Sequence, residues 1–272
     1  MLRNMADTTV VSADAEDPPE ARIVGSDRVL AVLTALAAHP DGVALDDLSR
    51  AVDSPKSTVH RALQSLRRAG FASQDGRGHY VLGDEYLRLA FAHHELRPEH
   101  VRVQPALLAL AERFGETTHY AVLSERSVIY RAKVDPPVGA VRLTSTIGGR
   151  NPAHSTAVGK LLLAQALPDD QAVLAWTASV ALQRRTPNTI VEPRALCAEL
   201  AEVRRRGYAV ENEENERGVN CLAVPVWLTS PSRPSGAVSV SGLTYRTPLS
   251  SLVDCAEEIR AIVTRATTWQ RD

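Results

Sequence analysis

Apolar side chains recur at intervals of three and four residues in three consecutive stretches near the beginning of the chain. The stretches cover residues 27–39, 44–53 and 54–70. This spacing places the apolar side chains on one face of a helix, so each stretch is predicted to be an amphipathic helix. The inward-facing residues are Val29, Val32, Leu33, Leu36, Ala37, Leu45, Leu48, Ala51, Val52, Val59, Ala62, Leu63, Leu66 and Ala69.

The third of these helices has clear sequence signals at both ends. Ser54 is predicted to cap its N-terminus, Pro55 to occupy the first helical position, and Gly70 to end the helix. After Gly70, the short runs FASQ and HYVL flank the turn DGRG, which predicts a two-stranded hairpin. A helix, a helix-turn-helix and a hairpin in this order form a winged helix-turn-helix domain.

Positive charge is concentrated on the third helix. Residues 54–70 carry five cationic side chains when His60 is counted, and no carboxylate, although the formal net charge of the 272-residue chain is -1. A solvated surface helix is one interpretation, but such helices usually mix charges of both signs. In a winged helix-turn-helix domain, the equivalent helix enters the major groove of DNA with its N-terminal half against the bases.

Arginine and glutamine can donate two hydrogen bonds to one base, and serine and threonine suit phosphate oxygens. The residues predicted to contact DNA are Lys56, Ser57, Thr58, His60, Arg61, Gln64, Arg68 and Arg77. Arg77 lies at the tip of the hairpin, where an ordinary exposed turn residue is the alternative interpretation.

The segment from Gly83 to Gly115 is predicted to be helical with breaks near Pro98 and Pro105. Its apolar face predicts a linker that also forms a dimer, because half-site recognition of DNA needs a two-fold partner.

Strands and helices alternate after Gly115. Strands are predicted at 117–124, 127–134, 140–147, 208–212, 218–228 and 236–243, with a hairpin turn at Glu125 and Arg126. Helices are predicted at 155–167, 169–178, 193–206 and 250–269, the first capped by Ser155. The three arginines at 204–206 suit the last turn of a helix, where cations favour the helix dipole, better than a nucleic-acid site.

Composition limits the class of protein. The length suits about two domains and the 44% hydrophobic content suits packed cores. We expect a cytoplasmic protein without a membrane partner, since no apolar window is long enough to span a bilayer and no signal peptide is recognisable. Cys197, Cys221 and Cys255 are odd in number and far apart, which suits a reducing compartment. Residues 1–22 are polar, acidic and aperiodic, so they are predicted to be disordered.

Five stretches resemble the IclR family of bacterial transcriptional regulators in order and spacing. They are SPKSTVHRAL, GHYVLG, IGGRNPAHSTAVGKLLLA, LAEVRRRGYAVENEENERGVNCLAVPV and VSVSG. The resemblance implies an α+β protein with a winged helix-turn-helix at 23–83, a linker helix at 84–98, and a GAF-like effector domain with a central antiparallel sheet at 99–272. The chain departs from the family at Asp53 and Ser54, where a glycine and an apolar residue are usual, although aspartate tolerates the turn geometry.

The residues of the second domain also predict a pocket. An irregular loop precedes the helix that begins near Ser155 and Thr156, and helix N-termini favour anions. Ser239 and Ser241 lie two apart on one strand, so they share a face and need hydrogen-bond partners there. A polar ligand is one such partner.

The resemblance places effector contacts on several of these elements, and His154 is a further candidate beside the helix start. The predicted effector-binding residues are Leu143, Thr144, His154, Ala157, Val158, Glu211, Cys221, Ser239 and Ser241. The family's effectors are often carboxylic or aromatic acids. Alternative interpretations remain: Cys221 as a small buried residue, the two serines on a solvent-facing edge, Glu211 as a turn cap, and His154 as a structural histidine.

We therefore predict a transcriptional repressor that binds a palindromic operator as a homodimer or dimer of dimers, controlled by a small-molecule effector. No catalytic residue, metal or cofactor is expected. The alternative is an enzyme or redox sensor that uses Cys221 with His154, or a metal site at His93, His94 and His100. The sequence contains no nucleophile elbow, His-Glu-x-x-His motif or phosphate loop that would favour an enzyme.

Overall fold

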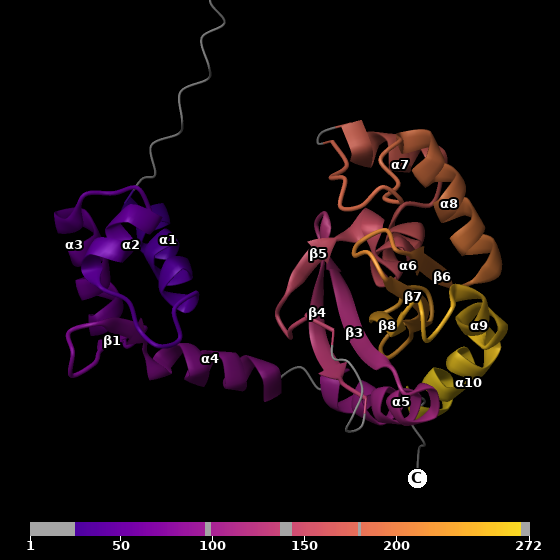
Figure 1. Cartoon of the computed structure of the whole chain (residues 1–272), viewed down its shortest axis with the longest axis horizontal. Coiled ribbons are helices and arrows are strands. Elements are labelled where there is room, and N and C mark those ends of the chain that lie inside the picture. Colours follow the sequence, from indigo (N-terminus) through magenta and orange to yellow (C-terminus); the bar gives the residue numbers. More distant parts are fainter. Residues whose placement is uncertain (1–24, 96–98, 137–142, 179–180, 268–272) are drawn as a thin grey trace, which may run out of the picture. The chain divides into compact units, whose positions relative to one another are not determined.

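The structure is a computed structural model that describes residues 25–95, 99–136, 143–178 and 181–267. The chain forms two compact units that divide after residue 96 (Figure 1). The tail predicted to be disordered lies outside the described residues.

The first unit is a small helical domain with a two-stranded hairpin. Its elements are α1 (Gly25–Ala37), α2 (Leu45–Ala51), α3 (Lys56–Arg68), β1 (Ala72–Gln74), β2 (Tyr80–Leu82) and α4 (Asp84–Glu95). Val32, Leu36, Leu48 and Leu63 are fully buried between the first three helices. The antiparallel pair β1 and β2 covers the remaining side of this core. The predicted winged helix-turn-helix order is confirmed.

The turn between α2 and α3 differs from the prediction in one detail. Asp53 adopts a positive φ of 43°, as the turn requires. The N-cap of α3 is Pro55, with no side-chain cap, because the Ser54 hydroxyl donates instead to the Val52 carbonyl at 3.1 Å. The prediction that Ser54 caps the helix is therefore wrong. Gly70, with φ of 78°, follows the helix end as predicted.

The helical segment after the hairpin contains α4 and α5 (Glu99–Phe114). The predicted break near Pro98 lies outside the described residues. Pro105 lies inside α5, so the predicted break there is wrong. An internal proline costs about 3 kcal/mol, and burial of Val103, Leu107 and Leu110 against the second unit's sheet offsets that cost.

An antiparallel sheet of six strands in the order β5-β4-β3-β8-β7-β6 forms the centre of the second unit. The strands are β3 (Thr117–Ser124), β4 (Ser127–Val134), β5 (Arg150–Pro152), β6 (Ala209–Asn212), β7 (Val219–Val226) and β8 (Gly236–Leu243). Glu125, with φ of 53°, turns the predicted hairpin between β3 and β4.

The predicted strand at 140–147 is wrong in its described part, since 143–147 form a loop and turn. The backbone carbonyls of Leu143 and Ser145 each accept a hydrogen bond from Lys133 Nζ at 2.8 Å, in place of a strand partner. The third strand of this part of the sheet begins later, at Arg150.

Helices cover both faces of the sheet (Figure 1). The helices α6 (Ala157–Ala166), α7 (Asp170–Ala178) and α8 (Pro193–Arg206) share one core, and α5 shares the other with α9 (Leu249–Asp254) and α10 (Ala256–Thr267). The predicted helix at 250–269 is thus divided at Cys255. Within the described ranges, no helix has the length and apolarity needed to cross a membrane.

The start of α6 also corrects a prediction. Ser155 lies in a 3-10 turn, and its hydroxyl binds the Pro152 carbonyl at 3.2 Å. Thr156 is the cap, because its Oγ1 accepts a hydrogen bond from the Gly159 amide at 3.1 Å.

Candidate functional site

The exposed side of α3 carries the predicted DNA-contacting residues. Lys56, Ser57, His60, Arg61, Gln64 and Arg68 are exposed, and Thr58 is half-buried. The helix holds this side outward because Val59, Leu63 and Leu66 are buried in the core of the first unit. We call Ser57, His60, Arg61, Gln64 and Arg68 the α3 face.

Among the residues that the structure describes, few contacts restrain the α3 face. His60 and Gln64 lie 3.5 Å apart at their ring and amide nitrogens, and Arg68 donates to Ser65 Oγ at 3.3 Å. Lys56 pairs with Asp46 of α2 at 2.7 Å, in an exposed contact that solvent screens. Long polar side chains on an exposed helix face are free to reorient toward base edges or phosphates.

The hairpin tip presents Arg77 to solvent. The Arg77 and His79 amides both donate to Asp75 Oδ1, at 2.9 and 2.8 Å, and hold the turn in place. Burial by itself would raise the pKa of the Asp75 carboxyl, but the two backbone hydrogen bonds favour its charged form, and on balance the pKa is lowered.

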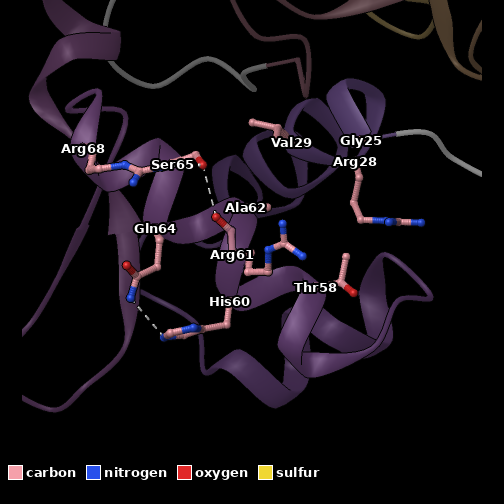
Figure 2. Close-up of a pocket in the computed structure, with 10 residues that line it drawn as sticks. All are labelled: Gly25, Arg28, Val29, Thr58, His60, Arg61, Ala62, Gln64, Ser65 and Arg68. Carbon is pink, nitrogen blue, oxygen red and sulfur yellow. Dashed lines mark hydrogen bonds between the residues drawn. The ribbon is translucent and has the colours of Figure 1, made fainter.

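A groove of about 480 Å³ lies between α1 and α3 (Figure 2). Its lining residues are Gly25, Arg28, Val29, Thr58, His60, Arg61, Ala62, Gln64, Ser65 and Arg68. The contribution of α1 was absent from the sequence prediction, because it is the packing of α1 against α3 that places Arg28 and Arg61 in the lining of one groove.

The second unit contains a pocket of about 210 Å³ that is lined by residues of all six strands and of the loop before β5. The lining residues are His119, Tyr130, Leu143, Thr144, Ser145, Thr146, Gly149, Arg150, Asn151, Arg185, Glu211, Asn215, Glu216, Val219, Cys221 and Ser241. Five of the nine predicted effector-binding residues therefore lie together, namely Leu143, Thr144, Glu211, Cys221 and Ser241.

The other four predicted residues lie outside this lining. Ala157 and Val158 are buried in the core between α6 and the sheet. His154 is buried with its Nε2 3.0 Å from the Gln183 carbonyl, and burial lowers its pKa. Ser239 is buried, with its hydroxyl 3.4 Å from that of Ser241.

Burial shifts the pKa values of two polar groups in the pocket, Glu211 and His119. Glu211 is only 3% exposed, and burial raises the pKa of its carboxyl to about 7. Burial lowers the pKa of His119 to about 3, so its ring is neutral. The ring lies between two hydroxyls, with Nε2 2.7 Å from Ser145 Oγ and Nδ1 3.4 Å from Ser241 Oγ.

Two arginines, Arg150 and Arg185, line the same pocket. Tyr130 supplies an aromatic surface, its ring 4.9 Å from that of His119, and its hydroxyl accepts a hydrogen bond from Asn151 Nδ2 at 3.3 Å. The sequence prediction did not include these residues. His119 lies on β3 and Tyr130 on β4, and the alternation of side chains along these predicted strands could have indicated which face each residue occupies. Arg185 gave no such signal, because it reaches the pocket from a loop far along the chain.

The alternative built on Cys221 lacks its catalytic geometry. Cys221 lines the pocket and His154 does not. Burial, followed by the nearby Glu211 carboxyl, raises the pKa of the thiol well above its usual value, so the sulfur stays protonated and a weak nucleophile. Within the ranges that the structure describes, no group of three or more His, Cys, Asp or Glu side chains is placed to hold a metal ion. The side chains of His93 and His94 lie outside the description.

A buried ion network lies next to the pocket. Lys160 of α6 is 1% exposed, and its Nζ lies 2.5 Å from Glu214 and 3.3 Å from Glu199, which also pairs with Arg206 at 3.0 Å. Glu214 lies in the turn that follows β6, three residues after Glu211, and Asn215 of this turn donates its amide to Glu211 Oε1 at 3.0 Å. One short turn therefore joins the pocket to α6 and α8.

The arginines at the end of α8 bind groups of their own unit. Arg204 donates to the Leu167 carbonyl at 2.8 Å, and Arg205 pairs with Glu202 at 2.5 Å. These contacts agree with the structural interpretation of the three arginines.

Comparisons with known proteins identify both units. The IclR helix-turn-helix domain matches residues 26–76, and the domain described as bacterial transcriptional regulator IclR C-terminal matches residues 94–267. The HTH-type transcriptional regulator XynR of Escherichia coli is 31% identical over 247 residues, which cover 86% of this chain and 92% of that protein. The transcriptional repressor IclR of the same organism is 32% identical over 245 residues, covering 89% and 86%.

A solved structure shows the same fold. The crystal structure of the Thermotoga maritima IclR superimposes with a TM-score of 0.71 at 25% identity, covering 89% of this chain and 96% of that one.

Proposed function

Because this chain belongs to the IclR family of DNA-binding transcriptional regulators and not to a family of enzymes, we propose that it is a repressor of a palindromic operator whose DNA affinity is set by a small acid bound in the second unit. The observation that carries the proposal is the α3 face, a row of cationic and amide side chains without a carboxylate, exposed on a helix that follows a tight turn.

The α3 face supports sequence-specific binding. Arg61 and Gln64 are exposed and three residues apart, so they lie on neighbouring turns of the same side. Arginine donates to guanine and glutamine to adenine in the major groove. Ser57 and Thr58, near the helix start, suit phosphate oxygens. Arg77 at the hairpin tip would then approach a neighbouring phosphate.

Self-association is supported by α4. Leu87 and Phe91 lie one turn apart and are 50% and 62% exposed. Tyr86 is 46% exposed on the same helix. Several large apolar side chains exposed on one helix indicate an interface, and a two-fold dimer presents two α3 helices to a palindrome. The proposed assembly is a homodimer or a dimer of dimers.

The pocket of the second unit favours a small carboxylic acid. Arg150 and Arg185 can pair with a carboxylate, and a protonated Glu211 can donate to one. The Tyr130 ring suits an aromatic or aliphatic body, and the hydroxyls of Thr144 and Ser145 suit polar substituents. A hydroxylated aromatic or aliphatic acid meets each of these groups.

Selection of DNA from a random-sequence pool by the purified full-length chain tests the DNA part of the proposal. We expect enrichment of a two-fold symmetric sequence with half-sites about one helical turn apart. Enrichment of sequences without two-fold symmetry would contradict the palindromic operator. The enriched duplex, called the selected duplex below, serves as the DNA in later experiments.

A further inference from the structure

The groove between α1 and α3 is a concave surface with a single sign of charge. Three arginines, Arg28, Arg61 and Arg68, line it together with His60, and none of the described residues that line it is a carboxylate. Figure 2 shows Arg28 and Arg61 extending from the two helices that border the groove. A surface of this kind attracts a negatively charged partner.

The first residue of the described chain, Gly25, itself lines this groove. The 24 residues before it contain five carboxylates and two arginines, and four of the carboxylates fall between positions 14 and 20. Those four are Asp14, Asp17, Glu16 and Glu20. The described chain therefore begins at the groove, and the sequence before it carries an acidic run of opposite charge.

We propose that the acidic segment 14–20 docks in the groove between α1 and α3 and competes there with DNA. The segment is long enough to reach along the groove, because an extended chain spans about 3.3–3.6 Å per residue, while the seven steps from Arg61 to Arg68 rise by only about 10 Å along the helix. This inference rests on the proposal that the α3 face contacts DNA.

The competition is expected to be modest. Each exposed ion pair is weak and is screened by salt. A tethered segment, however, is present at an effective concentration of about millimolar, so even weak pairs are populated. The segment would weaken DNA binding without abolishing it, and would disfavour non-specific sites that offer only phosphate contacts.

The test compares the full-length chain with a variant in which the segment is neutralised by Asp14→Asn, Glu16→Gln, Asp17→Asn and Glu20→Gln. Affinity for the selected duplex is measured by fluorescence anisotropy, in the native background and with Arg28→Gln or Arg68→Gln. We expect neutralisation to tighten binding by about 3- to 10-fold in the native background and to have little effect with either arginine replaced. Arg68 is exposed, so its replacement tests the groove without disturbing the core.

Arg77→Gln is the matched control, because it removes a cation of the same unit outside the groove. The increase in DNA affinity on neutralisation of the acidic segment should persist in the Arg77→Gln background. An equal increase in DNA affinity in all backgrounds would mean that the carboxylates of segment 14–20 repel DNA from a distance, and would overturn the inference. No gain in the native background would also overturn it. Failure of Arg61→Ala to weaken DNA binding would instead reject the proposed DNA interface, so the two failures are distinguishable.

Discussion

At the scale of single residues, Arg61 is the side chain on which the proposed DNA interface depends most. It is exposed in the first half of α3 and also lines the groove shared with α1. If its guanidinium reads a base, Arg61→Ala weakens binding to the selected duplex by about 1–3 kcal/mol. Fluorescence anisotropy measures this loss. Arg67→Ala, which removes an exposed arginine outside the α3 face, is the control. Equal affinities of the Arg61 variant and the native chain would remove Arg61 from the interface.

Glu211 predicts a pH dependence of stability. Its pKa is raised from 4.5 to about 7 by burial, so between these values the folded chain holds a proton that the unfolded chain has released. The resulting stabilisation is complete below the lower value and is lost as the pH rises to about 7, at up to about 1.4 kcal/mol per pH unit. Glu211→Gln should abolish this decline.

Thermal unfolding between pH 5 and 8 measures the effect as the difference in unfolding temperature between the native chain and the Glu211→Gln variant. That difference should change between pH 5 and 7 and stay constant above pH 7. Glu257→Gln, at a side chain that is 80% exposed, is the control. Parallel curves of unfolding temperature against pH for the native chain and Glu211→Gln would contradict the raised pKa of Glu211.

The predictability of single residues differs between the two sites. The whole α3 face followed from helical periodicity, because a helix surface is set by local sequence. In the pocket, Glu211, Cys221 and Ser241 followed from the family resemblance. Arg150 and Arg185 did not, since Arg150 lies in a short edge strand and Arg185 in a loop, and tertiary contacts determine the positions of both.

At the scale of elements, the start of α6 is a site of close packing. A Cβ on Gly159 would lie 2.1 Å from the Ala153 carbonyl oxygen and 2.6 Å from Thr156 Oγ1. Gly→Ala in a helix usually stabilises by about 1 kcal/mol. Here Gly159→Ala should instead destabilise the protein by about 1–3 kcal/mol, because the backbone must move.

Chemical denaturation checks this sign, with Gln165→Ala at an exposed position of the same helix as control. Stabilisation by Gly159→Ala would contradict this prediction, because it would show that the 3-10 turn before α6 moves at little energetic cost.

The elements themselves were predicted well where the pattern is periodic. Helices α1, α2, α3 and α8 and the hairpin of β3 and β4 all match the predicted ranges closely. The wrong predictions lie where contacts between residues far apart in the sequence determine the local structure. Burial of its apolar side chains keeps α5 helical across Pro105. Lys133 donates to the carbonyls of Leu143 and Ser145, in a loop that was predicted to be part of a strand. Ser54 and Ser155 both bind nearby carbonyls instead of capping a helix.

At the scale of the whole molecule, the α4 helix is the proposed link between copies of the chain. Leu87→Glu together with Phe91→Glu should weaken self-association, because each places a charge on an apolar interface. Analytical ultracentrifugation compares this variant with Leu174→Glu, a change at a side chain of α7 that is 42% exposed. Sedimentation of the α4 variant as the native species would contradict the proposed interface.

The arrangement of the second unit also explains how a ligand can act beyond its own pocket. Glu211 at the end of β6 and Asn215 in the turn after it line the pocket, while Glu214 in that turn binds buried Lys160. A ligand that shifts this turn would perturb α6 and α8 together. Such a ligand changes DNA affinity only if it binds the two arrangements of the protein with different affinities.

The most direct test of a repressor controlled by an acid is the affinity of the full-length chain for the selected duplex in the presence of acids that bind it. A panel of small carboxylic and aromatic acids is first screened for a rise in the unfolding temperature. A ligand at about 100 times its dissociation constant adds roughly 2.7 kcal/mol. We predict that at least one acid that binds changes the dissociation constant for the duplex by about 5- to 150-fold. Acids that stabilise the protein and leave its DNA affinity unchanged would contradict the account.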